Sequence, residues 1–139
     1  MSFEEKRAWI YAVIALGVPV GYFAVVLGRL RDSSAADVAY VWPLVIATGV
    51  AMLLNIVATI AAGAVSPKDV VPKDERDVGL DRRGEYVGFH VISLAALVPL
   101  GLAMAGVEHF WIANAIYLAY VLSAFASAVV KIVGYRRGF

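Results

Sequence analysis

Cysteine is absent from the sequence, and neither sign of charge is in excess. The first absence excludes disulfides, thiolate metal sites and cysteine nucleophiles. The second is seen in a formal net charge of only +1 over 139 residues. Because nucleic-acid binding depends on a basic field, which this chain lacks, nucleic acid is excluded as a partner.

Catalytic motifs are missing as well. The sequence contains no set of nucleophile, base and acid, no glycine-rich phosphate loop and no zinc-ligand spacing. We therefore expect a protein that is not an enzyme and that carries no cofactor. A stripe of carboxylates could face a hard cation, but the arginines between them disfavour a metal site. The four are Asp74, Asp77, Asp81 and Glu85.

Apolar residues are what the sequence has in abundance. Hydrophobic residues make up 62% of the chain and charged residues 17%, which is more apolar than an ordinary soluble domain. Four uncharged stretches each reach the ~20 residues that cross a membrane as a helix. They cover residues 8–28, 38–65, 86–107 and 110–130. The first has no convincing cleavage site, so we interpret it as a retained span and not as a signal peptide.

These stretches predict an all-α polytopic membrane protein. We expect four transmembrane helices in an up-down bundle of two hairpins, which form a single integral membrane domain over residues 1–139. No aspartate, glutamate, lysine or arginine lies in the core of a span, which disfavours a proton-coupled pump or a charge-gated channel. Abundant alanine, with lysine scarce beside arginine, indicates a prokaryotic source.

The cations are distributed unevenly around the spans. Arg29 and Arg31 lie between the first two spans, and the other ten cations flank the opposite span ends. The positive-inside rule therefore places both termini and the connection 66–85 in the cytoplasm, with the spans in the inner (plasma) membrane. The ten are Lys6, Arg7, Lys68, Lys73, Arg76, Arg82, Arg83, Lys131, Arg136 and Arg137.

Capping residues predict where helices begin. Ser66 as N-cap and Pro67 as first helical residue predict a short helix that Pro72 interrupts. We expect a new helix to begin at Pro72 and to continue into the third span, so that the third helix extends ~three turns into the cytoplasm. A capping box of Ser34 and Asp37 is expected to start the second helix.

The charges of this connection recur with a seven-residue step, which keeps like residues near one helix face. Arg76 and Arg83 have no carboxylate three or four residues away. We expect their partners on another helix, another subunit, lipid headgroups or a partner protein, although a solvated linker is the plain alternative. The candidate partner-binding residues are Asp74, Arg76, Asp77, Asp81, Arg83 and Glu85.

One string in the connection resembles a known pattern. Asp74-Glu75-Arg76-Asp77 is followed by Leu80, by Arg82-Arg83-Gly84 and then directly by a span. This order is similar to that of small uncharacterised prokaryotic four-helix membrane proteins with a DERD-type cytoplasmic loop. The resemblance implies the four-span topology and marks the loop, but it implies no reaction.

Several residues inside the spans carry further expectations. Pro19 and Pro99 should kink the first and third helices. Asn55 and Asn114 lie at different depths, and we expect each to hydrogen-bond to a neighbouring helix. Two GxxxG steps permit close helix approach; they are formed by Gly17 with Gly21 and by Gly84 with Gly88.

These features support three functional hypotheses. The leading one is a non-enzymatic membrane protein that self-associates, as a homodimer or larger homo-oligomer, and that binds or regulates a partner through its charged helix extension. The first alternative is a small homodimeric transporter or channel for an apolar or weakly polar molecule, with Pro19, Asn55 and Pro99 along the route. A cavity lined by Asn55 and continuous with one membrane face would favour this alternative, whereas a closed, fully packed bundle would favour the leading one.

The second alternative is a membrane haem or quinone protein. His90 and His109 are separated by 19 residues, about 28 Å along a helix. One chain therefore cannot hold a single haem between them. This alternative requires His90 and its copy in a second subunit at a symmetric interface.

Overall fold

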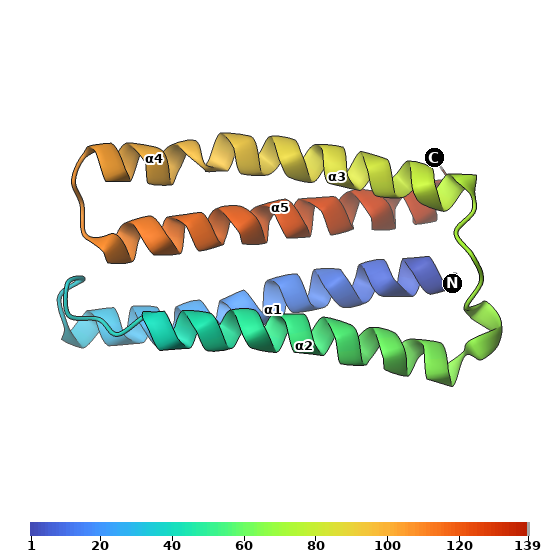
Figure 1. Ribbon diagram of the computed structural model, residues 1–139, viewed down its shortest axis with the longest axis horizontal. Helices are drawn as coiled ribbons and strands as arrows, with labels where there is room; N and C mark the ends of the chain where they lie inside the picture. The colour runs from blue at the N-terminus through green and yellow to red at the C-terminus, as the bar shows by residue number, and fades with distance from the viewer. Residues whose placement is uncertain (139) are drawn as a thin grey trace.

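The computed structural model describes residues 1–138, and within them every regular element is helical (Figure 1). The long helices are α1 (Phe3–Asp32), α2 (Val41–Val65), α3 (Glu75–Ala95) and α5 (His109–Arg137). A single 3₁₀ turn, η1 (Pro67–Asp69), follows α2, and the short helix α4 (Leu97–Met104) continues from α3.

Four helical segments are long and apolar enough to cross a membrane, which confirms the all-α class and matches the predicted number of span-length helices. They are Phe3–Asp32, Val41–Val65, Glu75–Met104 and His109–Arg137. Only 6% of the apolar window of α2 is buried inside the chain, and large hydrophobic side chains are exposed on every long helix. A water-soluble monomer rarely exposes apolar surface on this scale, so the helices suit a multi-pass membrane protein.

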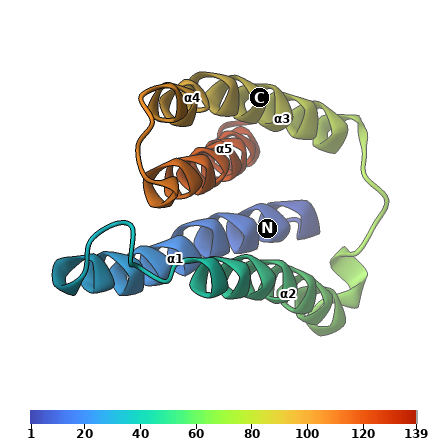
Figure 2. The same cartoon turned by 60° about the vertical axis from the view of Figure 1, so that its left-hand side comes forward.

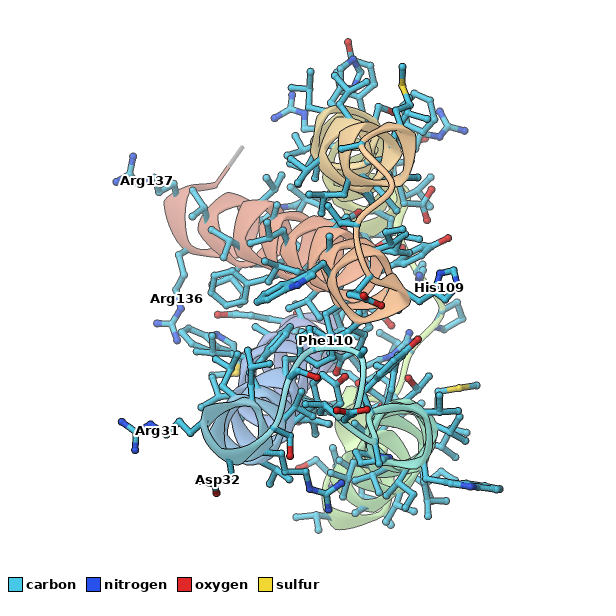
Figure 3. The ribbon with its side chains drawn as sticks, turned by 90° about the vertical axis from the view of Figure 1, so that its left-hand side faces the viewer. Arg31, Asp32, His109, Phe110, Arg136 and Arg137 are labelled. Atoms are coloured by element: carbon cyan, nitrogen blue, oxygen red, sulfur yellow. The ribbon has the colours of Figure 1, made fainter. Side chains whose placement is uncertain are left out.

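The helices pack in the order α2, α1, α5, α3. Helix α1 packs against α2 and α5, and α3 packs against α5. Helices α2 and α3 do not pack along each other, as the turned view (Figure 2) and the end-on view (Figure 3) show. Both termini and the α2–α3 connection lie at one end of the molecule (Figure 1). The bundle is therefore an open arc whose free edges are α2 and α3.

Small residues set the contact between α3 and α5. A Cβ added at Gly84 would lie 2.7 Å from Cε of Lys131 and 3.0 Å from the Ser127 carbonyl oxygen. The Ser123 hydroxyl donates to the Gly88 carbonyl at 2.7 Å. Gly84 and Gly88 thus let the two backbones approach closely, as the GxxxG step predicts.

The other GxxxG step is not used inside the chain. At Gly17 and Gly21, an added Cβ would meet no atom of another described residue within 4 Å. The sequence motif is the same in both places, but only the Gly84 step faces a neighbouring helix.

An aromatic cluster joins α1 and α5 at the end opposite the termini. The Tyr22 hydroxyl donates to Oδ1 of Asn114 at 2.5 Å, and Nδ2 of Asn114 donates to the Phe110 carbonyl at 2.7 Å. Val26 is fully buried beside them. Asn114 therefore forms the cross-helix bond that was expected of it.

The third helix begins at Glu75 and not at Pro72, so the predicted start is wrong. Asp74 is the N-cap: its side chain accepts from the Asp77 amide at 2.8 Å, and the Asp77 carboxylate accepts from the Asp74 amide at 3.1 Å. This reciprocal capping box satisfies the first amides of α3. The short helix expected after Ser66 is present as η1 and ends before Pro72.

The second helix also begins later than predicted. The Ser34 hydroxyl donates to the Asp37 carboxylate at 2.9 Å, and the Asp37 amide donates to the Ser34 carbonyl at 2.9 Å. These bonds close a local turn, so the expected capping box is wrong. Helix α2 starts at Val41, where Pro43 falls in the first turn and its missing amide costs no helical bond.

The third span-length helix is interrupted one turn before Pro99, where a kink was predicted. Pro99 has no amide to donate to the Ala95 carbonyl, and the helix is divided at Ala96 into α3 and α4. Helix α1 runs through Pro19 without an interruption, so the kink there stays a prediction. The segment Glu75–Met104 has 30 residues, but α1 has the same number. An extension beyond the membrane is thus not peculiar to the third helix.

Candidate functional site

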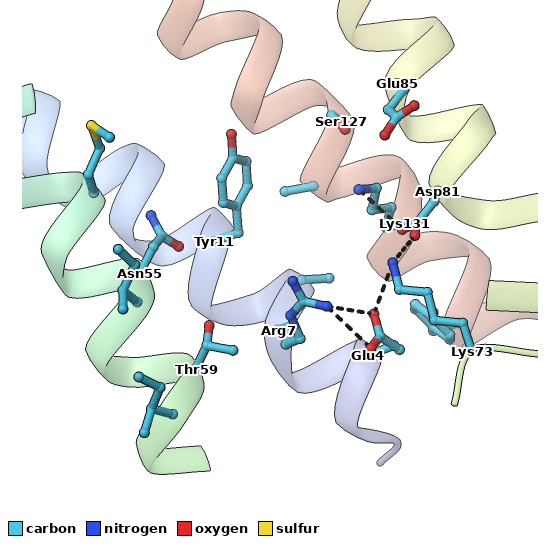
Figure 4. A pocket seen from close by; sticks show the side chains of 16 residues that line it. Glu4, Arg7, Tyr11, Asn55, Thr59, Lys73, Asp81, Glu85, Ser127 and Lys131 are labelled. Carbon is cyan, nitrogen blue, oxygen red and sulfur yellow. Dashed lines mark hydrogen bonds and ion pairs between the residues drawn. The ribbon is translucent and has the colours of Figure 1, made fainter. Parts of the chain in front are cut away.

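A cavity of about 830 Å³ occupies the open side of the arc, at the end that holds the termini. Its walls come from α1, α2, α3, α5 and the α2–α3 connection (Figure 4). The lining residues are Glu4, Arg7, Ala8, Tyr11, Met52, Asn55, Ile56, Thr59, Ile60, Lys73, Asp81, Glu85, Ser127, Ala128, Lys131 and Tyr135. The bundle is therefore not a closed, fully packed one.

One wall of the cavity is apolar. Helix α2 contributes Met52, Ile56 and Ile60, at helical spacing of one turn. Ala8 and Ala128 face them from α1 and α5, and both are buried. Small side chains on α1 and α5 leave the space that the larger residues of α2 border.

Five charged side chains at the end near the termini form one network. Nζ of Lys73 lies 3.7 Å from Oε2 of Glu4 and also pairs with the Asp81 carboxylate. Nζ of Lys131 lies 3.3 Å from Oδ1 of Asp81, and Nη1 of Arg7 lies 3.2 Å from Oε2 of Glu4. The bond from Lys73 to Asp81, which outweighs the opposing effect of partial burial, raises the pKa of Lys73.

Two further ion pairs hold the same end of the molecule. Nζ of Lys6 donates to Oδ2 of Asp69 at 2.9 Å, which ties α1 to η1. Nε of Arg136 lies 2.7 Å from Oε1 of the largely buried Glu5, an ion pair without hydrogen-bond geometry. The N-terminal turn of α1 is thus fixed to both the connection and the end of α5.

The start of α3 docks on the end of α5. Nη2 of Arg76 donates to the carbonyls of Gly134 and Tyr135, both at 3.2 Å. Its guanidinium lies 5.6 Å from the centre of the Tyr135 ring, and the Tyr135 hydroxyl donates to Asp77 at 2.6 Å. A cation at the C-terminus of a helix is favourable. The partner expected for Arg76 is therefore the C-terminal end of α5 in the same chain.

The structure therefore divides the predicted partner-binding residues. Asp74 and Asp77 cap α3, Arg76 holds α5, and Asp81 binds two lysines of the cavity network. Glu85 lines the cavity one turn beyond Asp81 (Figure 4). Arg83 lies outside the cavity with Arg82 and Tyr86, in a groove of about 300 Å³.

The residues of the transport hypothesis are not gathered at one site. Asn55 lines the cavity, whereas Pro19 and Pro99 are absent from its described lining. Nδ2 of Asn55 donates to the Ala51 carbonyl of its own helix at 3.0 Å. Within residues 1–138 Asn55 makes no bond to another helix, so the expected cross-helix role is wrong for Asn55 and right for Asn114.

Neither histidine lies at the cavity. Nδ1 of His90 is 2.8 Å from the Tyr86 carbonyl, and its ring contacts the Tyr86 ring in a tilted arrangement, with 4.2 Å between centroids. His90 is exposed on the outer face of α3, and His109 is the first residue of α5. Among the described residues, no three histidine, aspartate or glutamate side chains gather as metal ligands.

Sequence reasoning missed most of the cavity. Glu4, Lys73 and Lys131 come from three separate elements, and nothing in their local sequence links them. One signal was available: Lys131 is the only charged residue between His109 and Arg136 on an otherwise apolar helix, and such a residue usually faces a partner inside the bundle.

Comparison with protein-family models, with curated proteins and with solved structures finds no match. The resemblance at Asp74–Asp77 therefore stays a prediction.

Proposed function

We propose that this protein is a multi-pass membrane protein that binds a small amphiphilic molecule in the cavity and carries it within or across the membrane. The four span-length helices form an up-down bundle, with both termini and the α2–α3 connection in the cytoplasm. The observation that carries the proposal is the cavity lined by Asn55, the feature that the sequence analysis associated with transport. Partner binding through the extension becomes the second candidate, because most of its residues already have partners or capping roles in the chain.

The chemistry of the cavity supports an amphiphilic ligand. Its volume of about 830 Å³ falls in the range of small-molecule sites. Charged groups line the end near the termini, and Met52 and Ile56 line the part that reaches into the span. Asn55 is ten residues from the end of α2 at Val65, about 15 Å along the helix. A ligand with a polar head and an apolar body fits this gradient.

The open side of the arc supports access from the bilayer. Helices α2 and α3 do not pack along each other, yet both contribute lining residues. A membrane-dissolved molecule can therefore reach the cavity between them without crossing a packed interface. In this proposal the ligand arrives laterally from the cytoplasmic leaflet.

Photo-crosslinking tests this function. The protein is reconstituted in liposomes with a neutral long-chain alcohol that carries a diazirine, and the labelled peptides are identified by mass spectrometry. We expect labelling concentrated on the α2 segment 52–60. Ile56→Trp should fill the cavity and reduce that labelling several-fold.

The matched control is Val57→Trp. Val57 is the next residue of α2, has a similar exposed fraction of 54% against 56% for Ile56, and is not among the lining residues. This variant should leave labelling unchanged. Labelling spread evenly over the lipid-facing residues, or equal effects of the two tryptophans, would contradict the proposal.

A second candidate function is capture of a partner, or of a second copy, on the outer face of α3. The groove of about 300 Å³ beside Arg82, Arg83 and Tyr86 supports it. Arg82→Glu with Arg83→Glu should then abolish self-association or partner capture and leave the spans inserted. Unchanged oligomeric state and unchanged co-purifying proteins would count against this candidate.

A further inference from the structure

The charges of the cavity are not all balanced by partners. Six charged side chains line it, and five of them belong to the network of Glu4, Arg7, Lys73, Asp81 and Lys131. The sixth is Glu85. Within residues 1–138 it has no ion pair, not even with Arg82 three residues earlier. Glu85 is therefore the one lining charge of the described chain that is available to a ligand.

Glu85 also lies further along α3 than Asp81, its neighbour in the cavity lining. It follows Asp81 by one helical turn, about 6 Å, in the direction of the span. The lining also includes the uncharged Tyr11 on α1, Asn55 on α2 and Ser127 on α5, and Lys131 packs against the neighbouring Gly84. Figure 4 shows Glu85 on the side of the cavity away from Glu4 and Lys73.

We infer that the cavity selects lipophilic organic cations and that Glu85 is their counter-ion. This inference rests on the proposed function, and it names the class of ligand. A carboxylate near hydrocarbon attracts a cation more strongly than it would in water. The aromatic face of Tyr11 adds a cation–π contact, and Met52 and Ile56 contact the apolar body.

The same environment disfavours compact ammonium ions. Such an ion loses strong hydration when it enters an apolar wall, and the loss is costly. A delocalised cation with an apolar surface loses little hydration. The inferred ligand class is therefore large, delocalised and singly charged. Anions of the same size should bind less tightly, because Glu85 repels them.

The test compares two ions of nearly equal size and opposite charge, tetraphenylphosphonium and tetraphenylborate. Binding is measured by equilibrium dialysis against the full chain in nanodiscs, with protein-free nanodiscs as the blank. We expect saturable binding of the phosphonium, at least tenfold tighter than that of the borate. Glu85→Gln should weaken phosphonium binding at least tenfold.

The matched control is Glu75→Gln, an exposed glutamate of the same helix outside the cavity, which should leave binding unchanged. Ile56→Trp should weaken binding of the phosphonium because it fills the cavity. Equal binding of the two ions, or full phosphonium binding by Glu85→Gln, would overturn the inference that the cavity selects cations. Neither result would contradict the proposed function. If the neutral photo-crosslinker also fails to label residues 52–60, the proposed function fails as well.

Discussion

At the scale of single residues, the two asparagines have opposite roles. Asn114 is buried and joins α5 to α1 through the Tyr22 hydroxyl, whereas Asn55 bonds only to its own helix and faces the cavity. The sequence predicts that both are polar residues at different depths. It does not predict their partners, because the rotation of each helix about its axis depends on packing among similar apolar side chains.

Removal of the Tyr22 hydroxyl should destabilise the bundle. Tyr22→Phe leaves Oδ1 of Asn114 without its donor, and we expect a loss of about 1 kcal/mol in the free energy of unfolding. This loss is measured by unfolding each variant in mixed micelles and monitoring the transition by circular dichroism. Tyr117→Phe is the control, since Tyr117 packs in the same aromatic cluster without a hydrogen bond of its hydroxyl among the described residues. Equal stability of the two variants would contradict the role of this bond.

At the scale of helices, the sequence predicts that the four long helices exist, but it does not predict the residues at which they begin. Runs of ~20 apolar residues identify spans because backbone groups in lipid must be satisfied within a helix. The start of α3 depends instead on its two capping bonds, and α2 starts at Val41 without a side-chain cap. Ser34 and Asp37 bond to each other in a turn, and the capping box of α3 is formed instead by Asp74 with Asp77.

Close packing of α3 on α5 gives a prediction at this scale. Gly84→Leu places atoms where Lys131 and the Ser127 carbonyl already lie, and we expect a destabilisation of about 1–3 kcal/mol from overpacking. Gly79→Leu adds the same side chain to the same helix in open space. It should be neutral or should stabilise by up to ~1 kcal/mol through helix propensity. If Gly84→Leu unfolds no earlier than Gly79→Leu in the same micelles, the close contact is absent.

At the scale of the whole molecule, the order of packing produces the cavity. Hydropathy gives the number of helices but not which apolar faces meet, so the open arc of α2, α1, α5 and α3 could not be predicted from the sequence. The proposed sidedness, in contrast, is a prediction from the distribution of cations in the sequence.

Cysteine labelling in whole cells tests the proposed topology, because the natural sequence has no cysteine to interfere. Single cysteines at Ser2, Asp69 and Gly138 should be shielded from an impermeant thiol reagent, and one at Ser33 should react. Reaction of the Asp69 variant from outside would overturn the orientation.

The most direct test of the cavity is accessibility at one depth on two faces of α2. Asn55 lines the cavity, and Leu54, the preceding residue, does not. In inside-out vesicles, Asn55→Cys should react with an impermeant thiol reagent while Leu54→Cys, which faces lipid, stays unreacted. Equal protection of the two cysteines, or reaction of Asn55→Cys only from the opposite side, would contradict a ligand cavity that opens at the cytoplasmic end of the bundle.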